Sequence, residues 1–312
     1  IRAQEWEDFI GQDKVKEGLL IAIEAAKGRK EPMEHTLLYG PPGLGKTTLA
    51  HLIAKAMGVN MKITSGPALD RSGDLASILS NLESGDVLFI DEIHRLSKTV
   101  EEMLYSAMED FALDVILGKG PGARAVRLEL NPFTLVGATT KVGRIAAPLR
   151  DRFGVVYRMS FYDPNELKEI VMRAAKRLLM EVDEESAGVI ASRARKTARV
   201  ALKLLKRVRD FVAVRNESRV DPTVTLAALN MLEIDEQGLE EMDRKLLRAI
   251  VQKHEGGPVG IQTLAALINE EVETIEDVYE PYLLQIGFLK RTGRGRMVTP
   301  KAYEHLGLKV GN

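Results

Sequence analysis

The sequence contains no cysteine and no long apolar run, and it carries almost no net charge. Without cysteine the chain can form no disulfide, and it has no thiolate to bind zinc or an iron–sulfur cluster or to act as a nucleophile. No segment approaches the roughly 20 consecutive apolar residues of a membrane-spanning helix. The first residues do not resemble a signal peptide. We therefore expect a cytoplasmic protein with no membrane partner.

The charges nearly balance, with 44 Lys and Arg against 45 Asp and Glu, which excludes a surface that attracts nucleic acid everywhere. A local basic patch remains possible. Hydrophobic residues make up 45% of the 312 positions and charged residues 29%, as in ordinary globular proteins. The length suggests about two domains, or three if some are small.

Short apolar runs in the first half predict buried strands of a parallel sheet with covering helices. Residues 36–39, 86–90 and 133–137 lack polar alternation and stop at Gly or Asp. Two further runs flank a turn rich in Gly and Pro, which predicts a β-hairpin over residues 114–130, inserted in the sheet domain. The expected fold class is therefore α/β.

From residue 163 the pattern becomes helical, with Val200, Leu204 and Val208 repeating at helical spacing in a basic stretch. After a polar break at 233–238, three short helical patterns precede two strand-like segments around an Arg/Gly turn, as in a winged helix. The expected domains are a large sheet domain at 1–162, a small all-helical domain at 163–233 and a winged helix at 234–312.

Residues 40–48 (Gly-Pro-Pro-Gly-Leu-Gly-Lys-Thr-Thr) match G-x-x-x-x-G-K-[ST] between a strand and a helix. In such a loop the backbone N–H groups surround a phosphate, Lys46 reaches the β/γ oxygens, and Thr47 offers its hydroxyl to Mg²⁺. The alternative is a Gly-rich turn with an exposed lysine, but such a turn would not require every fixed position of the motif to be filled. The predicted nucleotide-binding residues here are Gly43, Leu44, Gly45, Lys46, Thr47 and Thr48.

The second apolar strand ends in Asp91 and Glu92, at the sheet edge where α/β folds bind ligands. Asp91 would hold magnesium through water, and Glu92 would activate the water that attacks the γ-phosphate. The pair favours hydrolysis over binding alone, although two acids can also end a strand by chance.

Three more polar residues near this edge are ambiguous. Thr139 and Thr140 end the third strand, where a hydroxyl could position the attacking water or sense the γ-phosphate, or could cap the next helix. His94 could couple the site to a neighbouring element or form a hydrogen bond at a helix start. We favour the helix-start bond for His94.

In this order the motifs resemble those of the AAA+ ATPases, and more narrowly those of the RuvB family of Holliday-junction branch-migration motors. The similarity runs from end to end. It rests on the phosphate loop, Asp91-Glu92, Gly137-Ala138-Thr139-Thr140, residues 148–154 and Arg199, and more narrowly on Phe9-Ile10-Gly11-Gln12, Asp91-Glu92-Ile93-His94-Arg95-Leu96, Gly118-Lys119-Gly120-Pro121 and Glu280-Pro281-Tyr282-Leu283.

The resemblance implies roles for residues outside the phosphate loop. Arg152 would be the arginine finger that reaches a neighbouring subunit's γ-phosphate in a homo-hexameric ring, with Arg150 a weaker candidate. Arg199 would sense that phosphate from the lid. Further residues would enclose the base and sugar or line the site: Ile1, Arg2, Ile10 and Tyr162, then Glu109, Asp110 and Phe111. Taken singly, these would be read as surface charges and core residues.

The resemblance also implies that the hairpin docks on RuvA, the protein that recognises the junction. Apolar residues on the ribbon fit such a surface, namely Val115, Ile116, Leu117 and Val126. Residues 281–303 contain five basic residues and no acidic one. On a wing, Arg291, Arg294 and Arg296 would contact phosphates of duplex DNA without reading bases; a solvated turn is the alternative.

Some positions depart from the family pattern. Ala3 and Gly293 stand where proline is usual, and Lys196 and Ala198 occupy the Gly and Pro positions before the sensor arginine. Losing that glycine and proline could shift how the lid helix begins and where Arg199 reaches.

The expected function is ATP hydrolysis with Mg²⁺ that moves duplex DNA through four-way junctions in recombination and repair. One alternative is a clamp-loader or replication-initiator ATP switch that deposits a partner on DNA. Another is a non-catalytic DNA-binding protein whose site only senses nucleotide.

Overall fold

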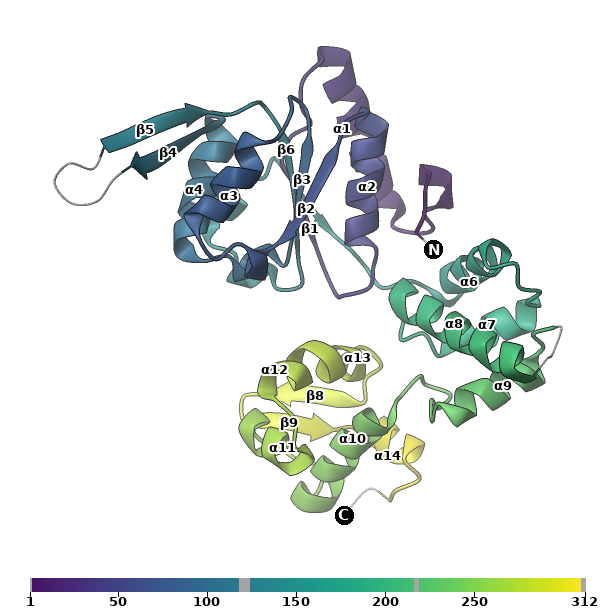
Figure 1. Cartoon of the computed structure of the whole chain (residues 1–312). Helices are drawn as coiled ribbons and strands as arrows, with labels where there is room; N and C mark the ends of the chain where they lie inside the picture. The colour runs from purple at the N-terminus through teal and green to yellow at the C-terminus, as the bar shows by residue number, and fades with distance from the viewer. Residues whose placement is uncertain (1, 118–123, 216–218, 310–312) are drawn as a thin grey trace. The chain divides into compact units, whose positions relative to one another are not determined.

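The computed structural model (Figure 1) describes residues 2–117, 124–215 and 219–309, without the side chains of 115–117 and 124–125. The chain forms two compact units, residues 1–162 with 197–199 and residues 163–196 with 200–312. Within the described ranges no helix is both long and apolar enough to cross a membrane.

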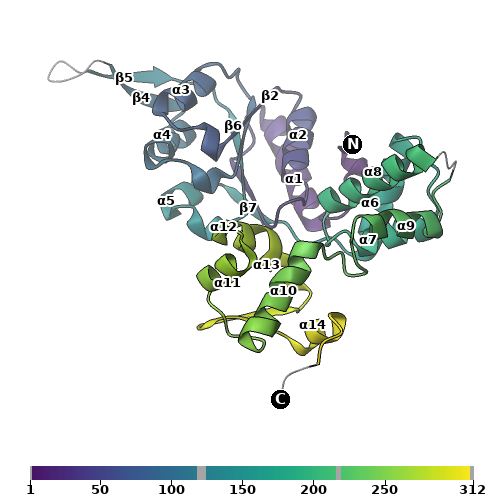
Figure 2. The same cartoon turned by 60° about the horizontal axis from the view of Figure 1, so that its bottom comes forward.

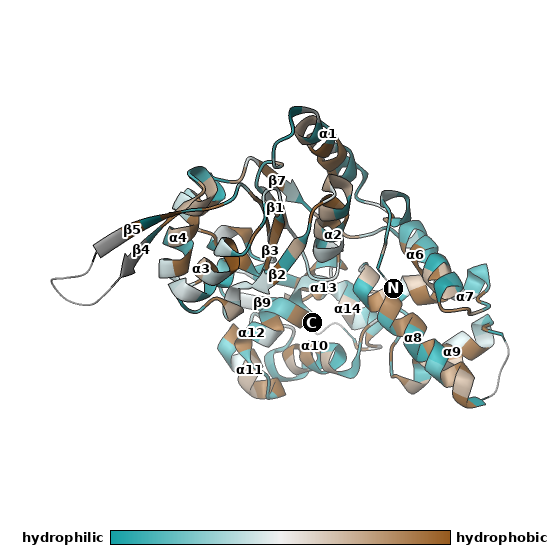
Figure 3. Ribbon diagram, turned by 45° about the horizontal axis from the view of Figure 1, so that its top comes forward, coloured by the Kyte–Doolittle hydropathy of each residue, from teal (hydrophilic) through white to brown (hydrophobic). Residues whose placement is uncertain are grey.

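A five-stranded parallel sheet forms the centre of the first unit (Figure 1). Its strands lie in the order β2 (Met61–Ser65), β3 (Val87–Asp91), β6 (Thr134–Thr139), β1 (Thr36–Tyr39) and β7 (Val155–Arg158). The central strands β3, β6 and β1 consist mostly of apolar residues, as the hydropathy colouring of Figure 3 shows. Because all strands are parallel, their carboxyl ends share one edge.

Helices cover both faces of this sheet (Figure 1). One face carries α1 (Asp13–Arg29) and α2 (Lys46–Met57), and the other carries α3 (Ser72–Ser80) and α4 (Lys98–Glu109). Leu75, Leu104 and Leu88 belong to one buried cluster that joins α3 and α4 to the sheet. Short elements complete the unit: η1 (Trp6–Asp8), η2 (Gly66–Ala68), η3 (Ile93–Arg95), η5 (Val142–Arg144) and α5 (Ala147–Arg150).

The predicted hairpin is confirmed as an antiparallel ribbon of β4 (Ala112–Leu117) and β5 (Arg124–Glu129). It is a separate two-stranded sheet that extends away from the rest of the unit (Figure 2). The predicted Gly/Pro turn at 118–122 and the side chains of Val115, Ile116 and Leu117 lie outside the described part. Val126 and Leu128 are 44% and 41% exposed.

The second unit begins with the helical lid. The Asp163 carboxylate accepts hydrogen bonds from the N–H groups of Asn165 and Glu166, and the Asp163 N–H donates to the Glu166 carboxylate, so a capping box starts the first lid helix. The lid helices are α6 (Pro164–Arg177), α7 (Glu184–Ser192), α8 (Ala198–Arg215) and α9 (Pro222–Met231).

The winged helix follows and has its own core, in which Leu246, Leu264 and Phe288 are fully buried. Its helices are α10 (Glu241–His254), α11 (Ile261–Ile268), α12 (Val272–Thr274), the π-helix η6 (Ile275–Tyr279), α13 (Glu280–Gln285) and α14 (Pro300–His305). The wing is the antiparallel pair β8 (Leu289–Thr292) and β9 (Gly295–Val298).

Candidate functional site

The phosphate loop lies between β1 and α2, at the carboxyl edge of the sheet. The Lys46 ammonium is buried and donates to the carbonyl oxygens of Gly40 at 2.8 Å and Pro41 at 3.0 Å. Burial lowers the pKa of Lys46, while the charges of Glu92 and Asp91 oppose that shift. The lysine is therefore held inside the loop, close to both predicted acids.

Two glycines of the loop allow distant segments to pack on it. Gly43 and Gly45 have φ values of 83° and 98°. A Cβ atom on Gly43 would lie 2.8 Å from the Cβ of Arg199, and one on Gly45 would lie 2.9 Å from the Phe9 ring. The Arg199 N–H donates to the Gly43 carbonyl at 3.2 Å. The structure thus brings the predicted sensor arginine to the phosphate loop.

The acidic pair ends β3 at the same edge. The Glu92 backbone is left-handed (φ 47°), and its N–H donates to Asp91 at 3.0 Å. One Glu92 carboxylate oxygen accepts the Thr140 hydroxyl at 3.1 Å and the Thr140 N–H at 3.3 Å. Thr140 is therefore bound to the predicted catalytic acid and does not cap the following η5 helix.

His94 also contacts this acid. Its Nδ1 lies 3.1 Å from the Glu92 carboxylate and 2.9 Å from the Thr139 hydroxyl. Burial lowers the pKa of His94, against the raising effect of Glu92, so the ring stays neutral to a lower pH than an ordinary histidine does. The favoured reading of His94 as a simple helix-start bond is wrong, because the ring also joins η3, which follows β3, to the end of β6.

Tyr162 and the amino-terminal segment also lie near the phosphate loop. The Tyr162 hydroxyl donates to the Leu44 carbonyl at 2.9 Å. Gln12 binds both backbone groups of Ser160, at 2.6 and 3.1 Å, which joins the segment containing Ile10 to the end of β7. The Arg2 guanidinium contacts His51 at 2.8 Å, and Ile1 lies outside the described residues. The base-and-sugar roles stay predictions.

The structure does not bring Arg152 to this edge. Its guanidinium binds Glu109 at 3.0 Å and the Pro148 carbonyl at 2.7 Å, and lies 4.5 Å over the Tyr105 ring. Arg152 precedes β7 and Glu109 ends α4, so both lie at the amino-terminal edge of the parallel sheet. The predicted role of Arg152 as an arginine finger stays a prediction.

The two residues that follow Glu109, Asp110 and Phe111, have partners of their own. Asp110 binds Arg127 at 2.9 Å, while the Phe111 ring packs 5.8 Å from that of Phe133. Neither contact involves the phosphate loop. Their predicted role in lining a nucleotide site stays a prediction.

The three wing arginines differ from one another. Arg296 is 8% exposed and binds Glu280 at 3.1 Å and Glu276 at 3.0 Å, while Arg291 binds Glu280 at 3.0 and 2.8 Å. Glu280 is only 1% exposed. Burial favours its neutral form, but bonds from both arginines outweigh burial and lower the pKa of Glu280.

Arg294 is exposed at the tip of the wing. No side-chain hydrogen bond or ion pair of Arg294 exists among the residues that the structure describes. DNA contact by all three arginines stays a prediction, but the geometry leaves Arg294 the most available.

Three family models account for nearly the whole chain. The P-loop domain of the Holliday junction DNA helicase RuvB matches residues 1–159. The RuvB AAA lid domain matches residues 162–235, and the RuvB C-terminal winged helix domain matches residues 236–307. The chain belongs to the RuvB family.

Solved structures of this family agree over the full length. Thermotoga maritima RuvB, described as a Holliday junction branch migration motor, is 51% identical, with 99% of each chain covered and a TM-score of 0.91. A proline-to-glycine variant of that protein is also 51% identical, with 100% of each chain covered and a TM-score of 0.93. The expected AAA+ fold with a lid and a winged helix is confirmed.

The departures before the sensor leave the local backbone in a shape that glycine favours. Lys196 has a φ of 55°, and Ala198 is the first residue of α8. A lysine in the left-handed region costs about 1 kcal/mol or more relative to glycine. In this RuvB-family chain the turn is therefore kept in spite of its sequence, and Arg199 still contacts the loop.

Proposed function

We propose that this chain hydrolyses ATP with Mg²⁺ and uses the energy to drive branch migration of Holliday junctions in recombination and repair. The chain would act as a homo-hexameric ring together with RuvA. The observation that carries the proposal is that Lys46, Glu92 and Arg199 gather at one edge of the sheet, whereas Arg152 lies at the other.

The residues at the carboxyl edge fit the chemistry of phosphoanhydride hydrolysis. Glu92 would take a proton from the attacking water as the new bond to the γ-phosphorus forms. The bond from that phosphorus to the β–γ bridging oxygen breaks, leaving ADP and phosphate. Thr140 orients the Glu92 carboxylate for this role, since it already donates two hydrogen bonds to it.

Cationic and hydroxyl groups in the loop fit a bound polyphosphate. The Lys46 ammonium would exchange the carbonyls of Gly40 and Pro41 for the β and γ oxygens of ATP. Thr47 and Asp91 are the residues that would hold Mg²⁺, a hard cation that prefers oxygen ligands, and the ion would neutralise phosphate charge. Their oxygens match this preference, and Asp91 lies near enough to Lys46 to affect its pKa.

The position of Arg152 supports sites that are shared between subunits. Because it lies at the amino-terminal edge, it would reach the γ-phosphate bound by a neighbouring copy and leave its contact with Glu109. A cation supplied by another subunit can accelerate phosphoryl transfer by roughly 10³-fold or more.

The β4–β5 ribbon and the wing are the surfaces that would bind the proposed partners, RuvA and DNA. The projecting ribbon exposes Val126 and Leu128, apolar side chains that suit docking on RuvA. Arg294 on the wing would contact DNA phosphates, which allows binding to any sequence.

The test is steady-state ATPase activity of wild type, Arg152→Ala and their mixtures, alone and with RuvA plus a four-way junction. Arg29→Ala is the matched control, since Arg29 ends α1 in an exposed ion pair with Glu31 at 2.9 Å. We expect stimulation by the partner and junction. In mixtures, Arg152→Ala should lower the ATPase rate by more than the share of variant subunits, because each variant subunit would also impair the site of its neighbour. Activity that is never stimulated and falls linearly with the Arg152→Ala fraction would contradict the proposal.

A further inference from the structure

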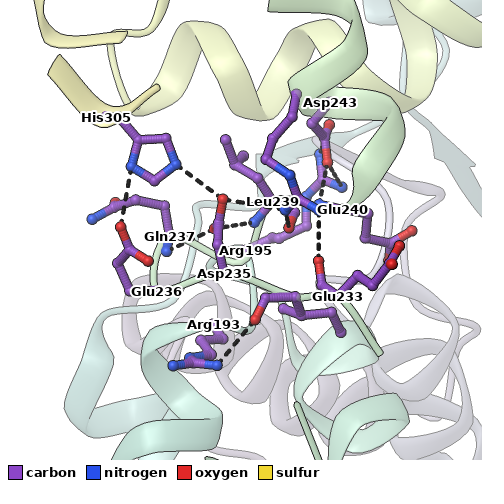
Figure 4. Close-up of polar contacts among 12 residues, drawn as sticks. Arg193, Arg195, Glu233, Asp235, Glu236, Gln237, Leu239, Glu240, Asp243 and His305 are labelled. Carbon is purple, nitrogen blue, oxygen red and sulfur yellow. Dashed lines mark hydrogen bonds and ion pairs between the residues drawn. The ribbon is translucent and has the colours of Figure 1, made fainter. Parts of the chain in front are cut away.

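A buried ion pair joins the lid to the winged helix within the second unit (Figure 4). Arg195 follows the lid helix α7, and its two terminal nitrogens bind the two carboxylate oxygens of Asp243 at 3.1 and 3.2 Å. Asp243 lies in the first turn of α10 and is fully buried. This paired geometry fixes direction as well as distance.

The same arginine also contacts the α13 side of the winged helix. Its guanidinium lies 4.8 Å over the Tyr282 ring, and the Tyr282 hydroxyl donates to the Gln237 carbonyl at 2.7 Å. Burial raises the pKa of Tyr282 to about 12, so this hydroxyl keeps its proton at neutral pH. Arg195 therefore touches two helices of the winged helix at once.

The linker beside this pair is held as well. Asp235 accepts the N–H groups of Gln237 at 3.0 Å and Leu239 at 2.8 Å, and its other oxygen lies 2.9 Å from His305 of α14. Arg193 donates to the Ile234 carbonyl at 3.0 Å from the lid side. Figure 4 shows these residues gathered around the connection. These contacts hold the lid and the winged helix in one arrangement, and we call the residues that make them, Arg193, Arg195, Asp235, Asp243 and His305, the joint.

The joint lies directly beside the sensor segment in the sequence. Arg195 and Lys196 have left-handed backbones, with φ values of 50° and 55°. The next three residues, 197–199, belong to the first compact unit, and the Arg199 N–H donates to the Gly43 carbonyl of the phosphate loop. Only three residues, 196–198, therefore lie between Arg195 and the predicted sensor Arg199.

We propose that Arg195 is a positioning residue that fixes the winged helix to the lid, so that movement of the sensor segment is passed to the DNA-binding domain. The proposal rests on the function proposed above and adds to it the residue that couples nucleotide state to DNA movement. The lid and the winged helix then move as one rigid body.

When Arg195 is removed, the carboxyl group of Asp243 can stay buried in its neutral form. Burial raises the pKa of Asp243 against the lowering effect of Arg195, so the carboxyl group can take up a proton when the arginine is absent. We therefore expect Arg195→Ala to fold. Arg195→Lys is the second variant, because it keeps the charge but loses the paired geometry.

The first measurement is the distance between spin labels on the full chain, which has no cysteine of its own. Labels at Lys206→Cys in α8 and Arg248→Cys in α10 report lid and winged helix, since both side chains are exposed. The expected result is one narrow distance distribution with and without adenylyl-imidodiphosphate. Arg195→Ala should broaden it, and Arg195→Lys should broaden it less.

The control for this measurement is Arg173→Ala, which removes a lid arginine bound to Glu169 within α6. It should leave the distribution narrow. An equally narrow distribution in both Arg195 variants would overturn the proposal, whatever the chain does to DNA.

The second measurement is junction movement per ATP hydrolysed, with RuvA and a four-way junction. Arg195→Ala should keep its ATPase rate without DNA within twofold of wild type and move the junction at least tenfold less per ATP. An unchanged ratio would overturn the coupling role. If wild type itself moves no junction, the proposed function fails, while the label distances still decide whether Arg195 fixes the joint.

Discussion

The nucleotide edge and the wing were both predicted from the positions of charged residues, but their side chains are arranged differently. At the sheet edge, Lys46, Glu92 and Thr140 gather as the motifs require. In the wing, Arg291 and Arg296 point to Glu280, and Arg294 alone of the three lacks a side-chain partner among the described residues.

The difference lies in what each pattern specifies. A phosphate-loop motif fixes a strand, a turn and a helix, so its residues arrive at known places. A run of basic residues fixes only charge. The acids that bind Arg296 come 16 and 20 residues earlier, in α13 and η6 respectively, and no spacing rule predicts them.

The largest expected effect is at the nucleotide edge. Glu92→Gln should retain ATP binding and lower turnover by roughly 10²–10⁴-fold, because the amide cannot accept the proton of the attacking water. Nucleotide titration and steady-state ATPase rates measure the two properties. The control is Glu83→Gln, an exposed acid just before β3. Retained turnover in Glu92→Gln would show that another group is the base.

The next effect tests the buried side of the wing. Arg296→Met should lower the free energy of unfolding by about 3–5 kcal/mol, since it leaves the buried Glu280 with one cation fewer. Thermal or denaturant unfolding measures this change. A stable variant that instead loses DNA binding would break the distinction between Arg296 and Arg294.

Arg294→Ala should show the opposite pattern. We expect an unchanged melting temperature and weaker binding to duplex DNA, with the slope of log affinity against log salt reduced by about 0.9. The measurement is DNA affinity over a range of salt concentrations. The exposed Lys176 in the lid helix α6 supplies the control, because Lys176→Ala removes one positive charge from outside the winged helix. An identical salt slope in Arg294→Ala and wild type would contradict phosphate contact.

A smaller effect concerns pH. The pKa of Glu280 is lowered in the folded chain, so its ionised form stabilises the fold above the unfolded value of about 4.5. That stabilisation should be lost as the pH falls from 4.5 through the folded pKa. Unfolding of wild type and Glu280→Gln, followed between pH 7 and pH 3, should show a stability difference that shrinks on acidification. A constant difference would exclude ionic stabilisation by Glu280.

Most of the fold could be predicted because its strong patterns are local. The strand at 36–39 has the predicted bounds, and β3 and β6 differ from the predicted runs by one or two residues at an end. β2 was missed because this edge strand is half exposed and contains Lys62. β7 was missed because Val155 to Arg158 is short and alternates in burial.

The site could be predicted where backbone geometry decides it, and less well where side chains choose their partners. The phosphate loop, Asp91 and Glu92 follow from motif and strand end. The contacts of Glu92 with Thr140 and of His94 with Thr139 join residues 48 and 45 positions apart, which no local pattern reports. The polar break at 233–238 marked a boundary, but Asp235 also organises the joint between lid and winged helix.

The most direct test of the account is branch migration of a synthetic four-way junction by the wild-type chain with RuvA, compared with Glu92→Gln. We expect ATP-dependent movement by wild type, no movement with adenylyl-imidodiphosphate, and none with Glu92→Gln although it still binds nucleotide and junction. Junction movement that continues without hydrolysis, or a wild-type chain that hydrolyses ATP on the junction and never moves it, would contradict the motor.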